Sequence, residues 1–436
     1  MRLAVRGDLL DFTADPGMED VSGLGARFRP DHWLLVEDGV VAGVQPASQP
    51  LQGDWERHDH GGKLVLPGFI DTHVHSGQID VIGAYGSALL DWLETHTFPA
   101  ERRMADAAHA RQVSELFLDA LLATGTTTAC VFPTVHTVSV EALFEAAQAR
   151  GMRLVAGKVL MDRHAPDFLC DADLPTAEAE CHALIERWHG RGRLAYAVTP
   201  RFAPTSSEAQ LAMAGRLLAS RPGLYMQTHV AEHRDEVRWV AELFPQARSY
   251  LDVYAQHGLL HERAIFAHGI WLDEADRAAL QAAGAQVAHC PSSNLFLGSG
   301  LFDWHQAQAA GVAVSFGCDV GGGTSLSMLR TMADSYKVQA MAGRRVTAWK
   351  CLHTATLGAA QALQLAHEIG SFALGTLADA AVWDWALGPV AQRRHAVARD
   401  LHDRLFAWMT LADERNVAAT YVAGQPRYRR DASPSA

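Results

Sequence analysis

The chain has 436 residues, of which 49% are hydrophobic and 20% are charged, so it can bury a sizeable core. Its 37 basic and 49 acidic residues leave a formal net charge of −12, and so acidic a surface argues against binding to phosphate backbones. The six cysteines form no Cys-x-x-Cys pair, and the sequence shows neither a signal-peptide h-region nor an apolar run of membrane-spanning length. We therefore expect a cytoplasmic globular protein that binds neither nucleic acid nor membranes.

The two ends of the chain share a β-rich pattern without long helices. Short β-branched pieces at 33–36 and 40–44 are separated by Gly and Pro turns, and a similar piece returns at 379–384. We predict that residues 1–66 and 367–436 together form one discontinuous β-sandwich, a small accessory domain.

Strand-like and helix-like segments alternate from Pro67 to about residue 366. The predicted strands end near His75, Pro133, Met161, Pro200, His229, His268, Pro291 and Asp319, and helical stretches include Val140–Arg150, Ala177–Trp188, Glu208–Ala219 and Glu274–Ala283. Eight such units in about 300 residues predict a (β/α)₈ TIM-like barrel over residues 67–366. A doubly wound open sheet is the alternative, but it would need a Gly-rich nucleotide loop after its first strand, and none is visible there.

Polar side chains follow several of the predicted barrel strands. His73 and His75 alternate on the first strand, so their side chains point the same way. His229 and His268 end the fifth and sixth strands, and Asp319 ends the eighth. Because active sites of such barrels gather at the carboxyl ends of the strands, these five side chains are expected on one rim. Imidazole and carboxylate groups are the ligands of a catalytic divalent metal, zinc first.

Three further histidines also lie near predicted strand ends: His136, His164 and His289. We expect hydrogen-bonding or loop roles for them. Spacing alone, however, does not separate His289 from His268, so the sequence pattern leaves that choice open.

The chain resembles the metal-dependent amidohydrolase superfamily and, within it, the guanine deaminase family over nearly its whole length. The matching stretches are Pro67–Gln78 (PGFIDTHVHSGQ), Ser87–Ala100 (SALLDWLETHTFPA), Gly125–His136 (GTTTACVFPTVH), Gly157–Arg163 (GKVLMDR), Thr199–Thr205 (TPRFAPT), Gln227–Glu232 (QTHVAE), His289–Gly300 (HCPSSNLFLGSG) and Gly317–Gly323 (GCDVGGG). Three positions depart from the family pattern, Gly77, His233 and Gly322, and each is expected to border the pocket.

The resemblance implies a single metal per chain, zinc (Zn²⁺) first and iron (Fe²⁺) as the alternative. Its ligands would be His73, His75, His229 and Asp319, with an open position for water. Asp319 would also accept the proton of that water. His268 would hydrogen-bond the hydroxide and the developing oxyanion, unless it is an ordinary core histidine.

Further roles carried over from the resemblance concern the substrate. Glu232 would carry protons to a ring nitrogen and to departing ammonia, and its alternative is a carboxylate that only stabilises a helix N-terminus. Arg201 would donate to a carbonyl such as guanine O6, Phe202 would stack on a flat ring, and Gln78 would read the base edge. Trp92 would form a pocket wall, with a buried helix tryptophan as the equal alternative.

The implied activity is hydrolytic deamination of guanine to xanthine and ammonia in purine catabolism and salvage, by a homodimer. A sibling aminohydrolase acting on another amino-purine or an amino-triazine is the nearest alternative. A metal-free scaffold on the same barrel is the alternative from another class of protein. A two-metal amide-ring hydrolase is disfavoured because the fourth strand, which ends at Pro200, carries no lysine.

Overall fold

The computed structural model describes residues 2–85 and 89–430. Residues 1, 86–88 and 431–436 lie outside the described part, and with them Ser87 and Ala88 of one family-like motif and the extreme ends of the predicted accessory domain. The chain divides into two compact units. One comprises Met1–Ile70, Asp119–Thr128 and Ser327–Ala436, and the other comprises Asp71–Leu118 and Ala129–Leu326.

A nine-stranded sheet forms the barrel. Its strands are β5 (Phe69–His75), β6 (Thr126–Phe132), β7 (Arg153–Ala156), β8 (Val159–Leu160), β9 (Leu194–Pro200), β10 (Tyr225–Val230), β11 (Ala264–His268), β12 (Gln286–His289) and β13 (Ala313–Phe316). The order is β5-β6-β7-β9-β10-β11-β12-β13, with β8 paired to β9. The pairs from β7 to β13 are parallel. The last strand returns to the first, since Thr72 Oγ1 donates to the Phe316 carbonyl at 2.9 Å and Asp319 N donates to the His73 carbonyl at 2.9 Å. The predicted TIM-like barrel is confirmed.

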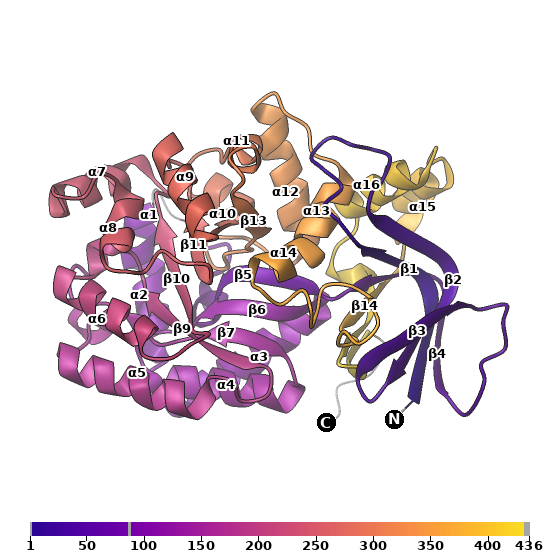
Figure 1. Ribbon diagram of the computed structural model, residues 1–436, viewed down its shortest axis with the longest axis horizontal. Helices are drawn as coiled ribbons and strands as arrows, with labels where there is room; N and C mark the ends of the chain where they lie inside the picture. Colours follow the sequence, from indigo (N-terminus) through magenta and orange to yellow (C-terminus); the bar gives the residue numbers. More distant parts are fainter. Residues whose placement is uncertain (1, 86–88, 431–436) are drawn as a thin grey trace. The chain divides into compact units, whose positions relative to one another are not determined.

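The barrel strands are buried because parallel strands carry helices outside and packed side chains inside. Every residue of β5, β6 and β9 is buried. In Figure 1, helices α5 (Leu174–Trp188) and α6 (Glu208–Ala219) lie outside β9, which both contact. The strand ends are therefore the places where polar side chains of this sheet can meet a ligand.

The predicted helices lie where the periodicity placed them. Helix α4 spans Thr137–Arg150 and α9 spans Glu274–Ala283, and both end at a glycine with a φ of 69°. A left-handed residue at this position favours glycine, which explains why Gly151 and Gly284 close these helices. The other helices associated with the barrel are α1 (Leu89–Trp92), α2 (Phe98–Arg103), α3 (Ala107–Ala123), α7 (Arg234–Leu243), α8 (Tyr250–Gln256), α10 (Pro291–Phe296) and α11 (Trp304–Ala309), with tighter or looser turns at Ser76–Val81, Leu93–Thr97, Asp167–Leu169 and Ala203–Thr205.

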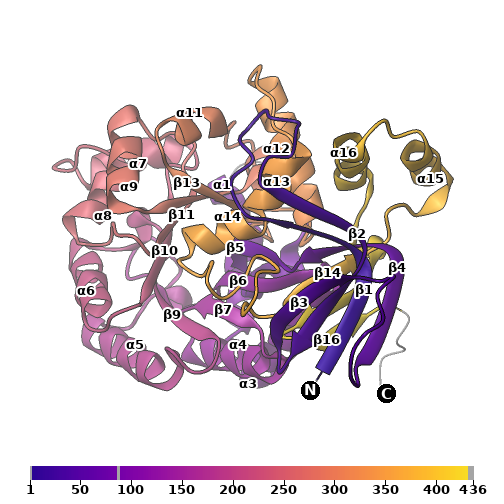
Figure 2. The same ribbon diagram turned by 45° about the vertical axis from the view of Figure 1, so that its right-hand side comes forward.

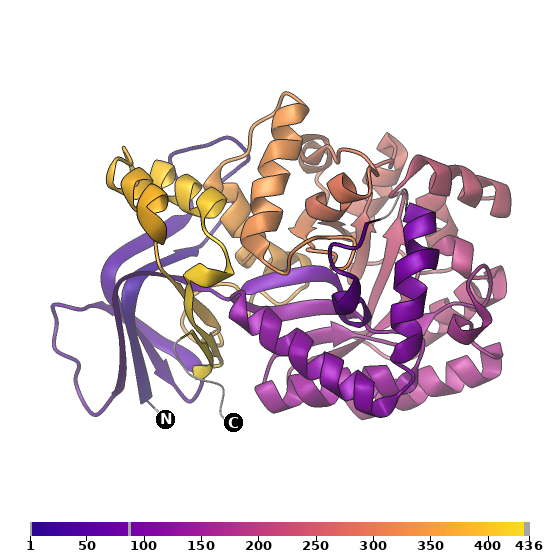
Figure 3. The same cartoon turned by 180° about the vertical axis from the view of Figure 1, so that it is seen from behind.

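The two chain ends build one β-structure, as predicted, in the form of a mixed sheet. Its strands are β1 (Arg2–Phe12), β2 (Ala26–Glu37), β3 (Val40–Pro46), β4 (Glu56–Pro67), β14 (Ala380–Trp383), β15 (Val417–Val422) and β16 (Gln425–Arg429), in the order β16-β15-β14-β4-β1-β2-β3. Strands β1 and β4 are parallel, and the neighbouring pairs are antiparallel. Figure 2 shows β1 to β4 side by side, and Figure 3 shows the indigo N-terminal strands beside the yellow C-terminal segment.

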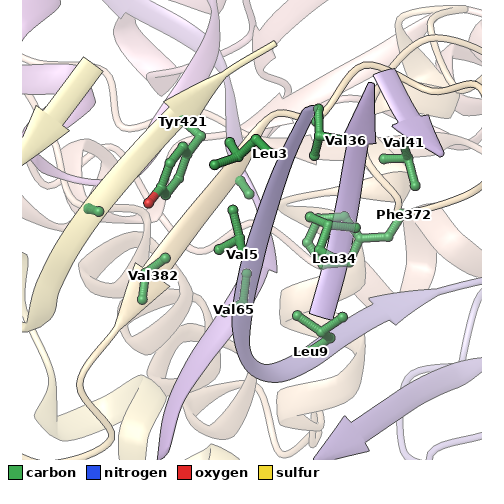
Figure 4. Packing of buried hydrophobic residues seen from close by; sticks show 13 residues of the cluster. Leu3, Val5, Leu9, Leu34, Val36, Val41, Val65, Phe372, Val382 and Tyr421 are labelled. Atoms are coloured by element: carbon green, nitrogen blue, oxygen red, sulfur yellow. The ribbon is translucent and has the colours of Figure 1, made fainter. Parts of the chain in front are cut away.

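A cluster of buried side chains holds this mixed sheet together. Leu3 and Val5 of β1, Leu34 of β2, Val382 of β14 and Tyr421 of β15 are all at most 1% exposed, and Figure 4 shows them converging on one side of the strands. Their alternation along each strand follows the period of two that puts every second side chain on one face.

Five helices belong to the same compact unit as the mixed sheet: α12 (Met328–Met341), α13 (Ala348–Thr354), α14 (Leu357–Ala362), α15 (Gly388–Ala396) and α16 (Leu401–Leu411). Helix α16 contacts α12, α13 and α15. In the part of the chain that the structure describes, no helix combines the length and apolar character needed to cross a bilayer.

Candidate active site

Four side chains from three barrel strands meet at the carboxyl ends of those strands. The nitrogens of His73 and His75 on β5, His229 on β10, and a carboxylate oxygen of Asp319 after β13 all lie within 4.8 Å of one another. Asp319 Oδ1 is 3.1 Å from His73 Nε2 and 3.2 Å from His75 Nε2. Burial alone would raise the pKa of Asp319, but the neighbouring imidazoles outweigh burial and hold that pKa well below its ordinary value. Asp319 is therefore an anion facing three imidazoles.

The protonation of these rings suits a divalent cation. His229 Nδ1 lies 2.7 Å from the Arg201 carbonyl, which can only accept, so Nδ1 carries the proton and the lone pair of Nε2 faces His75 Nε2, 3.2 Å away. His73 is 1% exposed, and its Nε2 faces the Asp319 carboxylate. Burial lowers the pKa of His73 to about 4, and burial with neighbouring imidazoles lowers the pKa of His229, so both rings are neutral at pH 7. Neutral imidazoles beside a carboxylate are a donor set that fits a divalent metal.

His268 and Glu232 form a second pair beside this cluster. His268 Nδ1 lies 2.8 Å from Asn294 Oδ1, which orients the ring so that Nε2 faces Glu232 Oε2 at 3.5 Å and Asp319 Oδ2 at 3.7 Å. The other oxygen of Glu232 accepts a hydrogen bond from Ser299 Oγ at 3.0 Å. Burial raises the pKa of Glu232. Burial would lower the pKa of His268, but the two carboxylates outweigh it and raise that pKa. The pair therefore retains a proton next to the cluster.

Two of these residues have an uncommon backbone conformation. The φ angle is 70° at His268 and 51° at Asp319, in the left-handed region that residues with a side chain rarely adopt. Such conformations concentrate where the surrounding structure must aim a side chain at a site. At both strand ends, the turn of the backbone accompanies a side chain directed at the cluster.

The opposite wall of the site is a hydrogen-bonded group of polar side chains. Arg201 Nη1 donates to both oxygens of Glu101, at 2.9 and 2.7 Å. Gln78 Nε2 donates to Glu101 Oε1 at 2.9 Å, while Gln78 Oε1 accepts from Gly321 N at 3.2 Å. All three side chains are buried, with residue exposures of 3% for Gln78, 1% for Glu101 and 4% for Arg201.

A cavity of about 440 Å³, its open mouth included, connects the two sides. Its lining residues are His75, Gln78, Trp92, Leu93, Arg201, Phe202, His229, Glu232, His268, Leu297, Asp319 and Gly322. Every residue for which the sequence predicted a catalytic, metal-binding or substrate-binding role lines this cavity except His73. Among the lining residues, Glu232 and Asp319 are the only carboxylic acids.

The structure shows which of His268 and His289 belongs to the site, a choice that their spacing in the sequence left open. His289, at the end of β12, has its ring 4.9 Å from that of Phe302 and close to Trp304 and Phe316. Burial lowers its pKa to about 3. His289 is absent from both the cavity lining and the groups of side chains close enough to hold a metal, as far as the described residues go.

The three departures from the family pattern do not all touch the cavity. Gly322 lines it, and a Cβ there would lie 2.7 Å from Ser293 Oγ. Gly77 instead packs among Thr134, Met104 and Glu101, because a Cβ there would lie 3.0, 3.4 and 3.6 Å from their side chains. His233 is the N-cap of α7, where its side chain accepts from the backbone N–H of Asp235. The expectation that all three border the pocket is therefore wrong for Gly77 and His233.

Four supporting residues were not recognised from the sequence: Glu101, Glu236, Asn294 and Ser299. Asn294 and Ser299 lie inside a motif that the family resemblance covers, yet no chemistry distinguished them from their neighbours. Glu236 accepts from the backbone N–H groups of Glu232 and His233, both at 3.1 Å, and from Tyr250 Oη at 2.6 Å. An acid three residues after an N-cap is a capping-box pattern, and that pattern could have identified Glu236.

The barrel and its strand-end cluster define the class of the protein. The amidohydrolase family model matches residues 64–427, so the chain belongs to the amidohydrolase family, whose members are metal-dependent.

Known relatives show to which members of the family the chain is similar. A guanine deaminase of Escherichia coli (strain K12) is 45% identical over 442 residues, covering 98% of each chain. The solved structure of E. coli guanine deaminase matches with a TM-score of 0.94 at 43% identity, over 99% of this chain and 100% of that chain. The structure of a guanine deaminase from C. acetobutylicum with guanine bound in its active site matches with a TM-score of 0.88 at 25% identity, over 98% of this chain and 100% of that chain.

Proposed function

We propose that this protein is a guanine deaminase, a hydrolase that converts guanine and water to xanthine and ammonia in purine catabolism and salvage. The observation that carries the proposal is a single small-molecule cavity with an imidazole–carboxylate cluster and Glu232 on one side and the donors Arg201 and Gln78 on the other. Guanine needs both sides, because it carries an amino group to be displaced and a ring carbonyl that accepts hydrogen bonds. The similarity to guanine deaminases over nearly the full chain supports the same activity.

The metal site is proposed to consist of His73, His75, His229 and Asp319. Three imidazole nitrogens and one carboxylate favour zinc, with iron(II) as the alternative. A divalent metal bound there lowers the pKa of water, so that a nucleophile is available at neutral pH. The side chain of Asp319 serves twice, as a ligand and as the acceptor of the proton that water gives up.

The remaining side chains have two kinds of role: some bind the ring, and one transfers protons. Arg201 and Gln78 donate to the ring carbonyl and the base edge, and Phe202 and Trp92 enclose the flat ring. Glu232, whose pKa is raised by burial, gives a proton to the ring nitrogen beside C2.

Proton transfer then completes the exchange of groups at C2. As the oxygen of water bonds to C2, His268 Nε2 hydrogen-bonds to that oxygen. Glu232 receives the proton held by Asp319 and passes it to the amino group, the C2–N bond breaks, and ammonia leaves. The proton remaining on the new C2 oxygen then returns to Glu232 as the C2 carbonyl forms, which restores the acid for the next turnover. Glu232 and Asp319 both face His268 Nε2, at 3.5 and 3.7 Å, so the two carboxyl groups flank the same atom.

A sibling aminohydrolase that acts on another ring is the second candidate function, and the position of Gly322 supports it. The residue lines the cavity with no side chain, and a Cβ added there would lie 3.6 Å from Asp319 Oδ2. The space beside the reacting group could therefore admit a substituted amine or a differently shaped amino-azine.

Ammonia release by metal-quantified protein tests the function directly. Guanine, adenine, cytosine, 8-oxoguanine and aminated triazines should be compared under identical conditions. Selective release from guanine at about one metal per chain is expected, because the two groups of described side chains close enough to hold a metal share His73 and Asp319. If the protein turned over another ring but not guanine, the sibling activity would replace guanine deamination as the proposed function. If the protein contained no metal and turned over none of these rings, the metal-free scaffold would be the better interpretation.

We further propose a cytoplasmic homodimer, in which residues 67–366 form the hydrolase barrel and residues 1–66 and 367–436 form the accessory domain. The family resemblance supports this organisation. Light scattering on the purified chain tests the dimer, and a mass of one chain would contradict it.

A further inference from the structure

The wall that faces a ring carbonyl depends on one buried carboxylate that does not itself line the cavity. Glu101, on α2, is 1% exposed and lies behind Gln78 and Arg201. Its Oε1 accepts from both Gln78 Nε2 and Arg201 Nη1, and its Oε2 accepts a second contact from the same Arg201 nitrogen. The two residues that border the ring are therefore joined through a single anion.

The contacts of Gln78 determine which way its amide points. A glutamine amide can turn over at almost no steric penalty, exchanging its acceptor oxygen with its donor NH₂ group. Here the Gly321 N–H, which can only donate, faces Gln78 Oε1, and the ionised Glu101 carboxylate, which can only accept, faces Gln78 Nε2. Only one of the two orientations satisfies both neighbours. One N–H of Gln78 is used by Glu101, and the other remains for the cavity.

Arg201 is held in the same manner. Its guanidinium carries five N–H donors and no acceptor, and the hydrogen bonds to Glu101 use Nη1 alone. The Phe98 ring lies 5.5 Å from the guanidinium carbon and packs on it. Because Arg201 is 4% exposed, its charge needs a buried partner, and Glu101 is that partner.

We propose that Glu101 is a positioning residue that fixes Gln78 and Arg201 as a donor surface and thereby makes the site select rings with a carbonyl over rings without one. The inference rests on the proposed function and extends it to substrate choice. A carbonyl oxygen matches a surface of N–H donors, whereas its absence leaves buried donors without a partner, which is the arrangement that gives strong discrimination.

The test compares guanine with 2-aminopurine, which has the same amino group at C2 and no carbonyl at C6. Glu101→Gln keeps the volume of the side chain but removes its charge and offers a donor to Gln78 or Arg201. The expected kcat/KM for guanine falls about 10–100-fold, the range found when a supporting partner of a site residue is lost, and the loss lies mainly in KM. The expected kcat/KM for 2-aminopurine changes less than about threefold, so the preference for guanine falls at least about threefold.

The controls separate positioning from general damage. Glu94→Gln removes a charge from an exposed residue of the preceding turn and should leave both substrates within about twofold of wild type. If Glu101 had a purely structural role, the substitution would lower kcat/KM for both substrates by the same factor. That result, which leaves the preference for guanine unchanged, overturns the proposal. Metal content should stay at the wild-type value.

A second variant covers a failure of Glu101→Gln to fold. Glu101→Asp keeps the buried charge but withdraws it by one methylene, so its hydrogen bonds lengthen; the guanine preference should fall at least about threefold, and an unchanged preference overturns the proposal. Wild-type protein inactive on guanine would refute the proposed function instead. The Glu101 variants would then be compared on the ring that is turned over and on its analogue without the carbonyl.

Discussion

Glu232→Gln is the substitution that most sharply separates proton transfer from binding. Glutamine has nearly the same shape and can still accept the hydrogen bond that Ser299 Oγ donates at 3.0 Å. It cannot carry a proton at neutral pH. The variant should therefore fold, bind metal and bind guanine, yet fail to protonate the ring nitrogen and the departing amine.

The size of the loss follows from the composition of the cavity wall. General acid–base catalysis contributes about 10²–10⁴-fold. Glu232 and Asp319 are the only carboxylic acids among the residues lining the cavity, and Asp319 is held as an anion, with its pKa well below the ordinary value. Since no second acid can replace Glu232, we expect a loss in kcat near the top of that range, about 10³–10⁴-fold, which is about 4–5.5 kcal/mol in activation free energy.

The assay follows guanine consumption by ultraviolet absorbance together with metal analysis of the same sample. Ser299→Ala is the matched control, because it removes the neighbour's hydrogen bond and leaves the carboxyl group in place; its loss should stay within about tenfold. A Glu232→Gln enzyme that retains kcat within about threefold of wild type would refute the assignment of both proton transfers to one carboxyl group.

Three further outcomes are expected. Arg201→Ala should lower kcat/KM for guanine by about 10²-fold or more without loss of metal, because a buried donor to the carbonyl is removed; turnover at the wild-type level would contradict the role of Arg201. Glu236→Gln should change the pH dependence of stability. Burial raises the pKa of Glu236 from 4.5 to about 7, so the folded protein holds a proton that the unfolded chain releases, and wild type loses stability as pH rises from 4.5 to about 7. In calorimetry, the melting temperature of the variant minus that of wild type should therefore rise as the pH rises through this window. A difference that does not change with pH would contradict the assignment to Glu236. Leu34→Ala removes a side chain that is 1% exposed in the core of the mixed sheet and should lower the free energy of unfolding by about 2–5 kcal/mol in urea titrations, with kcat unchanged; a shift under about 1 kcal/mol would mean that the core is not packed as described.

The barrel was predictable because local patterns and tertiary structure agree there. Strands buried on both faces read as continuous apolar runs, and the helices between them end at glycines that adopt a left-handed conformation, as at Gly151 and Gly284. The mixed sheet was predictable only as β-structure from both ends. Its central pairing joins Val382 to Val65, more than 300 residues apart, and β1 runs parallel to β4 with a register shift between Arg6 and Asp8. Such a register depends on contacts that the sequence pattern does not encode locally.

The site shows the same division between local and distant information. His73 and His75 could be recognised because the period of two in a strand puts both on one side, and the remaining polar strand ends could be recognised because the barrel collects them. Their roles as ligands remain predictions, which metal analysis of His229→Ala would test. The supporting residues could not be found in this way. Glu101 stands in a short helix beside the exposed Arg102, with the exposed Glu94 in the preceding turn, and only its burial distinguishes it.

A common physical property explains why the supporting residues escaped sequence reasoning. Residues that meet a metal or a ring must have a particular chemistry at a particular strand end, so residue type and position together identify them. Glu101, by contrast, acts on Gln78 and Arg201, which come from other segments of the chain, and any element able to bring a carboxylate between them would serve. The choice of α2 is made by the fold. Substrate preference in this site therefore depends on a residue that touches no substrate, and substitutions there should change which ring is accepted while every metal and ring contact stays in place.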